Sequence, residues 1–344
     1  MKHTFTLYLF KRLLLGAVTL LVILFSSYAL LRLAPGDPTK SSMLGENGAS
    51  SMSAEKGALA KNDSLRKKLH LDEPLTVGFF HWLKGICRGD LGESAAVDKG
   101  RPVGDLIRER LGVTLSLNVL AILLTYALAV PLGVFSAVKQ GTLSDRLINT
   151  LLFFLYSLPV LWSALMLQAL LCKGGYYPVF PLKGITPEIT PGMSSFQIAF
   201  RTLTHCVLPV ICLSYGSLAS LARFVRSGML ETLKMDYIRT ARAKGVPERE
   251  VIFHHAMRNV MILLITLFAG LLPSLISGSI LLEYVFNIPG MGSLSMMALS
   301  SRDIPLLMAL FGMGGALTLL GILLADILYV LADPRIDFNS QESA

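Results

Sequence analysis

Residues 223–258, RFVRSGMLETLKMDYIRTARAKGVPEREVIFHHAMR, lie between two strongly apolar segments. This stretch contains eight Lys and Arg residues and four acidic residues. Short basic connectors between membrane spans stay on the cytoplasmic side, because Lys and Arg near span ends resist translocation. We therefore predict that this stretch is a cytoplasmic loop.

The pattern within the loop predicts a helix, a turn and a second helix. Apolar residues recur at helical spacing at Leu230, Leu233, Tyr237 and Ala241. Gly245 suits the C-terminal end of the first helix, and Pro247 with Glu248 behind it suits the first turn of the second. A membrane protein that holds such an element at its cytoplasmic face offers it to a partner.

The composition places the chain in a lipid bilayer. Of its 344 residues, 53% are hydrophobic and 16% are charged, and the mean hydropathy is +0.60. A span needs roughly 20 helical residues to cross a hydrocarbon core of about 30 Å. Six uncharged stretches are long enough, namely Leu13–Leu31, Leu111–Val138, Leu147–Cys172, Thr202–Ala222, Asn259–Leu282 and Ile304–Ala325. We expect an all-α membrane protein with six transmembrane helices.

Charge sets the expected topology. The inside loops are 139–146 and 223–258, so both termini are expected to be cytoplasmic. The expected organisation is a cytoplasmic N-terminus with the first span (1–33), a small, mostly helical extracytoplasmic subdomain (34–110), a five-helix core that includes the basic loop (111–332) and a cytoplasmic tail (333–344). Within the subdomain we predict a rigid turn at 34–38 and a short helix from Asn62 through Leu69.

Three further features have ordinary explanations. Leu13–Leu31 is longer than the 7–15 residues typical of a signal h-region, so it is expected to be an anchor. The net charge of +8 fits the positive-inside bias and anionic headgroups better than nucleic acid. The four cysteines have no metal-binding spacing; buried thiols are favoured over a bridge between Cys172 and Cys206.

Proline and glycine interrupt the predicted spans. Kinks are expected at Pro131, Pro159, Pro209 and Pro273, since each removes a backbone hydrogen bond. Close helix contact is expected at Gly312, Gly314, Gly315 and Gly321, either within the chain or with a second membrane subunit.

The spans lack the residues of an enzyme or an ion-driven carrier. We find no nucleophile, metal cluster or paired carboxylates in them, and Glu283 is expected to be a polar anchor at a water-accessible outer end. No GxxxxGK[ST] loop is present to hold a nucleotide phosphate. The best intramembrane polar residues are Asn118, Asn149, Gln168 and His205. They either line a pathway or hydrogen-bond between helices.

Several segments together resemble the permeases of ABC importers, in the branch that transports peptides and nickel. Tyr237 to Gly245 and His255 to Asn259 resemble the EAA loop of that family, with Arg239-Thr240-Ala241 at the Glu-Ala-Ala position. Further matches occur in order at 34–38, 71–75, 88–92, 101–103, 131–134, 283–286, 289–292 and 333–335.

The resemblance implies a permease that pairs with a second, similar permease, two cytoplasmic ATPase subunits and an extracytoplasmic solute-binding protein. The partner ATPases would use ATP and Mg; this chain would bind no cofactor or metal itself. Residues expected to couple to the ATPase are Tyr237, Arg239, Thr240, Ala241, Arg242, Lys244, Gly245 and Arg249. An extracytoplasmic gate loop is expected at Glu283, Pro289, Gly290 and Gly292.

The expected function is import of di- or oligopeptides by alternating access, in a bacterial cytoplasmic membrane. A nickel or nickel-chelate importer of the same family, an ion-coupled secondary transporter and a non-transporting membrane scaffold are the alternatives. The secondary transporter would move solute on an ion gradient without an ATPase, and the scaffold would bind the ATPase without solute flux.

Overall fold

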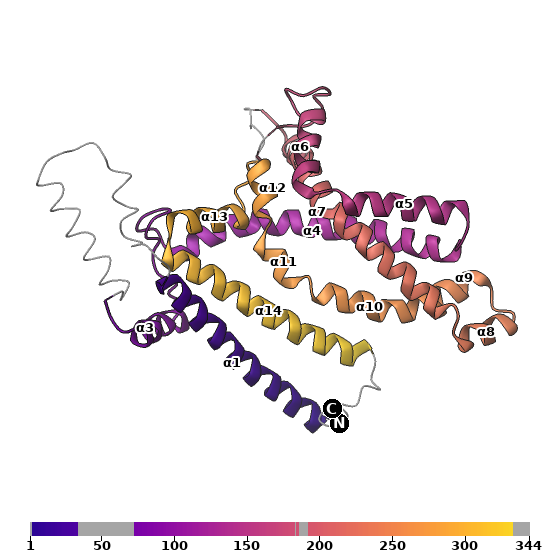
Figure 1. Ribbon diagram of the computed structural model, residues 1–344, viewed down its shortest axis with the longest axis horizontal. Helices are drawn as coiled ribbons and strands as arrows, with labels where there is room; N and C mark the ends of the chain where they lie inside the picture. Colours follow the sequence, from indigo (N-terminus) through magenta and orange to yellow (C-terminus); the bar gives the residue numbers. More distant parts are fainter. Residues whose placement is uncertain (1, 34–71, 183, 186–191, 333–344) are drawn as a thin grey trace, which may run out of the picture. The chain divides into compact units, whose positions relative to one another are not determined.

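The computed structural model describes all residues except 1, 34–71, 183, 186–191 and 333–344 (Figure 1). The described part is helical and contains no β-strand, only isolated bridges between Glu93 and Pro102 and between Cys172 and Phe180. The chain divides into two compact units. Of the described residues, those within 2–112 and 291–323 form unit 1, and those within 113–290 and 324–332 form unit 2.

Unit 1 is built from the two ends of the chain. Its helices are α1 (Lys2–Leu33), α3 (Leu75–Cys87), the beginning of α4 (Val103–Val138), α13 (Met291–Ser301) and most of α14 (Ile304–Ala332). The aromatic side chains of α3 divide between two environments. Phe79 is buried against Tyr28 of α1, with ring centroids 5.8 Å apart, whereas Phe80 is 66% exposed.

Helices α1 and α14 pack against each other through glycines. A Cβ added to Gly312 would lie 3.3 Å from Leu24, and one added to Gly315 would lie 3.1 Å from Leu20. The numbering runs in opposite directions along the two helices, so they are antiparallel. For these two glycines, the close contact lies within the chain.

A buried carboxylate organises the loop before α4. Asp303 is fully buried, and its oxygens accept hydrogen bonds from the Ser94 hydroxyl at 2.5 Å and from the backbone N–H groups of Ala96 and Val97, both at 3.0 Å. Asp303 also accepts from the Leu306 N–H in the first turn of α14. One side chain therefore caps a helix and fixes a loop about 200 residues earlier in the sequence.

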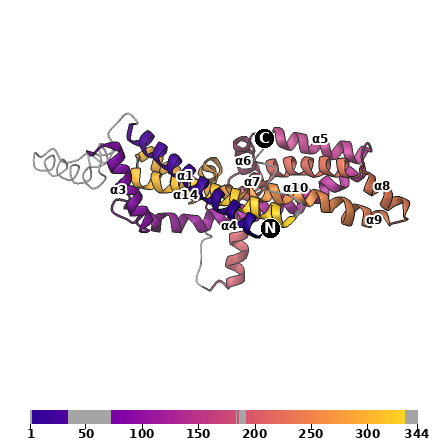
Figure 2. The same cartoon turned by 90° about the horizontal axis from the view of Figure 1, so that it is seen from below.

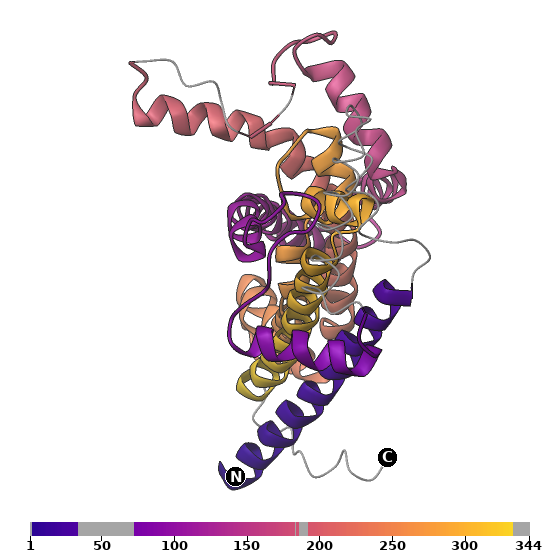
Figure 3. The same cartoon turned by 90° about the vertical axis from the view of Figure 1, so that its left-hand side faces the viewer.

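Unit 2 holds the remaining helices. They are the rest of α4, α5 (Leu143–Ser157), α6 (Val160–Leu171), α7 (Ser195–Thr232), α8 (Asp236–Ala243), α9 (Glu248–Glu250), the π-helical segment η1 (Val251–Ala256), α10 (Met257–Ala269), α11 (Leu272–Ser277) and α12 (Ile280–Val285). α4 and α5 form a hairpin, and α7 lies beside it (Figures 1 and 2). The first turns of α7 project away from the remainder of unit 2 (Figure 3).

Two hydrophobic clusters stabilise unit 2. One joins α4, α6, α7 and α12, with Leu117, Ala164 and Leu208 at its centre. The other joins α4, α5, α7, α8, η1 and α10. In this second cluster Gly133 of α4 is needed for close approach, because a Cβ there would lie 2.6 Å from the carbonyl oxygen of Ala222 in α7.

Among the described residues, four helices are long and apolar enough to cross a membrane, and five if the bent pair α5–α6 forms one span. The segment expected to be the fifth span is divided into α10, α11 and α12, with Gly278 at φ 69° before α12. The structure thus supports a multi-pass helical protein, and the count of six stays a prediction.

The prolines behave in two ways. Pro159 lies at a 96° bend between α5 and α6, and Pro273 lies in the first turn of α11. Pro131 and Pro209 lie inside α4 and α7, which continue through them. The four cysteines are free, and three of them are buried. The turn at 34–38, the helix at 62–69 and the tail from 333 lie outside the described residues.

Candidate coupling site

The predicted turn between two helices is present, but the first predicted helix, from Leu230 to Ala241, is divided between α7 and α8. After α7 ends at Thr232, three residues lead into α8, and α9 follows α8 and continues into η1. Pro247 is the N-cap of α9 rather than part of its first turn. We call residues 236–250 the elbow; it lies at the same end of unit 2 as the α4–α5 turn (Figure 1).

One face of α8 is seated in the core of unit 2. Ile238 is fully buried and Ala241 is 8% exposed, and both belong to the cluster that contains Val225 and Met229 of α7. The predicted periodicity placed Tyr237 on this face, but Tyr237 is 45% exposed. The difference arises because α7 ends and α8 begins anew, so the helical phase is not carried across the turn.

The turn that ends α8 is a Schellman motif. The N–H of Val246 donates to the carbonyl of Ala241 at 3.2 Å, and the N–H of Gly245 donates to that of Arg242 at 3.0 Å. Gly245 has φ +80°, a conformation that costs a residue with a Cβ more than it costs glycine. The predicted capping role of Gly245 is confirmed.

An ion pair closes the elbow. Arg242 of α8 donates from Nε to Glu248 Oε2 at 3.1 Å and from a terminal nitrogen to Oε1 at 2.6 Å. The Arg242 hydrogen bonds lower the pKa of Glu248, and the same bonds raise the pKa of Arg242. Both side chains are about half exposed, at 42% and 55%. Arg242 therefore already has a partner within the elbow.

The exposed side of the elbow carries both signs of charge, with four cations and three carboxylates. Arg239, Lys244 and Arg249 are exposed, and the Arg239 guanidinium lies 3.6 Å from the carboxylate of Asp236. Within the described part of the chain, Lys244 and Arg249 take part in no ion pair. The Thr240 hydroxyl donates to the Asp236 carbonyl, so it is satisfied within α8. Lys244 and Arg249 are the cations most available to a partner.

Two of the four candidate pathway residues join helices to neighbouring backbone. Asn118 of α4 donates to the carbonyls of Ser274 and Leu275 in α11, at 3.0 and 2.8 Å. Gln168 of α6 donates to the carbonyl of Val285 at 2.9 Å. These hydrogen bonds satisfy backbone carbonyls of α11, shortly before the break between α11 and α12, and at the end of α12.

The other two candidates bond elsewhere. His205 Nδ1 lies 2.8 Å from the Arg201 carbonyl one turn earlier in α7. Asn149 belongs to a partly buried cluster with Ser136, Asp145 and Arg226. The four polar side chains therefore do not gather at one site in the structure.

Glu283 of the expected gate loop is not at a water-accessible end. It is 4% exposed, the Thr114 hydroxyl donates to its Oε1 at 3.3 Å, and a Cβ on Gly290 would lie 2.5 Å from its carboxylate carbon. The expectation of a solvated anchor is wrong, because the segment 286–290 folds back over the carboxylate. Asn287, at φ 50°, supplies the left-handed residue of this turn. Pro289 is exposed, and Gly292 is buried within α13 of unit 1.

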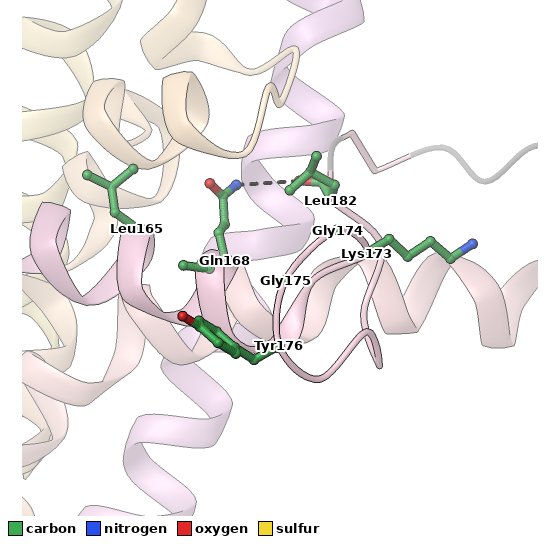
Figure 4. Close-up of a pocket in the computed structure, with 8 residues that line it drawn as sticks. Leu165, Gln168, Lys173, Gly174, Gly175, Tyr176 and Leu182 are labelled. Atoms are coloured by element: carbon green, nitrogen blue, oxygen red, sulfur yellow. Dashed lines mark hydrogen bonds between the residues drawn. The ribbon is translucent and has the colours of Figure 1, made fainter.

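A hollow of about 670 Å³ lies beside α6 and the loop after it (Figure 4). Gln168 points across it to the Leu182 carbonyl, whereas the Lys173 side chain extends away (Figure 4). Its lining residues are Leu165, Gln168, Ala169, Lys173, Gly174, Gly175, Tyr176 and Leu182. Among the described residues no three His, Cys, Asp or Glu side chains gather closely enough to hold a metal ion.

Sequence reasoning missed three participants in this region. Ile238 seats α8, Glu248 binds Arg242, and Asp145 binds Arg226. Ile238 could have been found from its i, i+3 relation to Ala241. The long-range pair between Asp145 and Arg226 leaves no local signal, because 81 residues separate its members.

These features define a multi-pass helical membrane protein that presents a cationic helix–turn–helix. A family profile described as "Binding-protein-dependent transport system inner membrane component" matches residues 129–338, and a profile for the N-terminal part of such components matches residues 5–118. The chain belongs to this family of inner-membrane components of transport systems, and it is a permease component rather than an enzyme.

Relatives of this chain extend over nearly its whole length. It is 35% identical to the oligopeptide transport system permease protein AppB of Bacillus subtilis, over 96% of this chain and 99% of that protein. It is 36% identical to a putative peptide permease of Brucella ovis, over 96% and 98% of the two chains. A probable peptide ABC transporter permease of Sinorhizobium fredii is 34% identical, over 96% and 99%.

Proposed function

We propose that this chain is one of two permease subunits of an ATP-driven importer of di- or oligopeptides. The observation that carries the proposal is similarity, over 96% of the chain, to proteins named as peptide and oligopeptide permeases. A second, similar permease, two ATPase subunits and a solute-binding protein complete the assembly.

The elbow is the proposed contact for the ATPase. The sequence holds no phosphate-binding loop, so ATP and Mg are bound by the partner and its work must enter through a protein contact. Burial of Ile238 and Ala241 anchors α8, and exposure of Lys244 and Arg249 offers charge to an acidic surface. Tyr237, Arg239 and Thr240 lie on the exposed side of the same helix.

The proposed mechanism is alternating access. Closure of the two ATPases pushes the elbows of the two permeases together, the spans reorient, and solute delivered outside is released inside. In this scheme both termini and the elbow are cytoplasmic, and the segment from Glu283 to Gly292 forms the outer gate. Asn118, Asn149, Gln168 and His205 remain the candidates for polar contacts along the route.

Charge reversal at the elbow tests the docking role. Lys244→Glu with Arg249→Glu should abolish peptide uptake and co-purification of the ATPase subunits, while membrane insertion stays normal. The matched control is Lys84→Glu, which changes an exposed lysine of α3 in unit 1. Normal uptake by the elbow variant would refute the docking role.

The cargo is tested separately. The complex is purified with its binding protein, and the small molecules it retains are identified by mass spectrometry. Peptides of two or more residues support the proposal, whereas a nickel chelate or a glycoside as the retained molecule contradicts it.

A further inference from the structure

A partly buried polar cluster joins three helices of unit 2. It joins Ser136 of α4, Asp145 and Asn149 of α5, and Arg226 of α7, and we call these four residues the polar joint. Asp145 is 4% exposed, and Ser136 is fully buried. All four residues lie outside the elbow.

The carboxylate of Asp145 is saturated with donors. Its Oδ1 accepts from Ser136 at 2.5 Å, Asn149 at 2.6 Å and Arg226 Nε at 2.9 Å. Its Oδ2 accepts from Arg226 at 2.9 Å and from the Gly141 N–H at 3.0 Å. The guanidinium thus binds in the two-point geometry that fixes orientation as well as distance.

The joint connects the elbow to the α4–α5 hairpin. Arg226 lies on α7 less than two turns before that helix ends, and α8 follows after three residues. The neighbouring Val225 packs with Ile238 of α8 and Ala137 of α4 in one hydrophobic cluster. Apolar contacts of this kind are non-directional and allow helices to slide, whereas a two-point ion pair holds their register.

We propose that Asp145 and Arg226 are positioning residues that lock the α4–α5 hairpin to α7, so that a push on the elbow moves three helices together. The inference rests on the proposed function, in which the ATPase acts on the elbow. Without the lock, α7 would follow the elbow while α4 and α5 lag, and ATP hydrolysis would proceed with little transport.

The test uses the full complex of permeases, ATPases and binding protein in proteoliposomes, with ATP hydrolysis and peptide uptake measured together. The double variant Asp145→Asn with Arg226→Gln removes both charges and leaves no unpaired ion. ATPase co-purification and hydrolysis should persist, and uptake per ATP should fall about tenfold, the range expected for loss of coupling between sites. The matched control, Arg146→Gln, removes an exposed charge one residue away and should keep the normal ratio.

A milder variant tests the same inference if the double variant does not fold. Arg226→Lys keeps the charge and loses the two-point geometry, so it should also lower uptake per ATP. An unchanged ratio in an assembled Arg226→Lys complex overturns the inference while leaving the proposed function intact. A wild-type chain that binds no ATPase overturns the proposed function and this inference with it. Uptake driven by a proton gradient in the isolated chain, and lost in Asp145→Asn, overturns both in favour of an ion-coupled carrier.

Discussion

Two Arg–carboxylate pairs in unit 2 have nearly the same geometry and opposite surroundings. Arg226 and Asp145 meet at 2.9 Å with side chains 24% and 5% exposed, and Arg242 and Glu248 meet at 2.6 Å with side chains 42% and 55% exposed. Water screens the second pair and competes for its hydrogen bonds, but in the first pair it barely reaches the carboxylate of Asp145. The comparison indicates that exposure to water, rather than contact distance, decides how much an ion pair contributes to stability.

The largest expected effect comes from breaking the buried pair on one side. Asp145→Ala leaves the Arg226 guanidinium, Ser136 and Asn149 without their common acceptor, and we expect a loss of about 3 kcal/mol in stability. The thermal inactivation midpoint of the purified protein in detergent measures it, with Arg146→Ala as the exposed control. A midpoint equal to that of the control would show that the Asp145–Arg226 pair contributes no stability.

A second change disturbs the buried pair without touching its charges. A Cβ at Gly133 would lie 2.7 Å from the Cβ of Val225, next to Arg226, so Gly133→Ala should push α4 away from α7. Overpacking of this kind costs about 2 kcal/mol. Gly216→Ala, in α7 where a Cβ meets nothing within 4 Å, is the control and should be neutral. The same thermal assay applies, and equal midpoints for the two variants would contradict the close packing.

The exposed pair should contribute little to the stability of the protein and more to the conformation of the elbow. Arg242→Gln is expected to change stability by less than about 1 kcal/mol, because exposed ion pairs contribute little. Uptake should fall with Arg242→Glu and recover when Glu248→Arg is added, since the swap restores the bridge across the elbow. Failure of the swap to restore uptake would mean that Arg242 contacts the ATPase directly.

The smallest expected effect is a pH dependence confined to the elbow. Arg242 depresses the pKa of Glu248, so the pair stabilises the elbow above the ordinary pKa of a glutamate and loses this effect as pH falls through the depressed value. Hydrogen exchange at the Val246 amide, compared with Glu248→Gln at each pH, measures it. The two proteins should differ at neutral pH and converge in acid; a constant difference would exclude this titration.

The sequence was sufficient for the helical class, the elbow and its glycine turn, because these depend on local signals. Hydropathy marks long apolar helices, and Gly245 followed by Pro247 marks the turn. The sequence did not predict the burial of Glu283, because that burial depends on a loop folding back. It also did not predict the Asp145–Arg226 pair, because the two residues meet only after three helices pack. Tyr237 was misplaced because a short turn resets the helical phase between α7 and α8.

The antiparallel contact of α1 with α14 has a consequence for biogenesis. Leu20 and Leu24 leave the ribosome almost 300 residues before Gly312 and Gly315, the glycines they pack against. During synthesis α1 is therefore in the membrane before α14 exists, and the two helices can pack only when translation is nearly complete. A nascent chain cut short before the final helix would leave Leu20 and Leu24 without these glycine contacts.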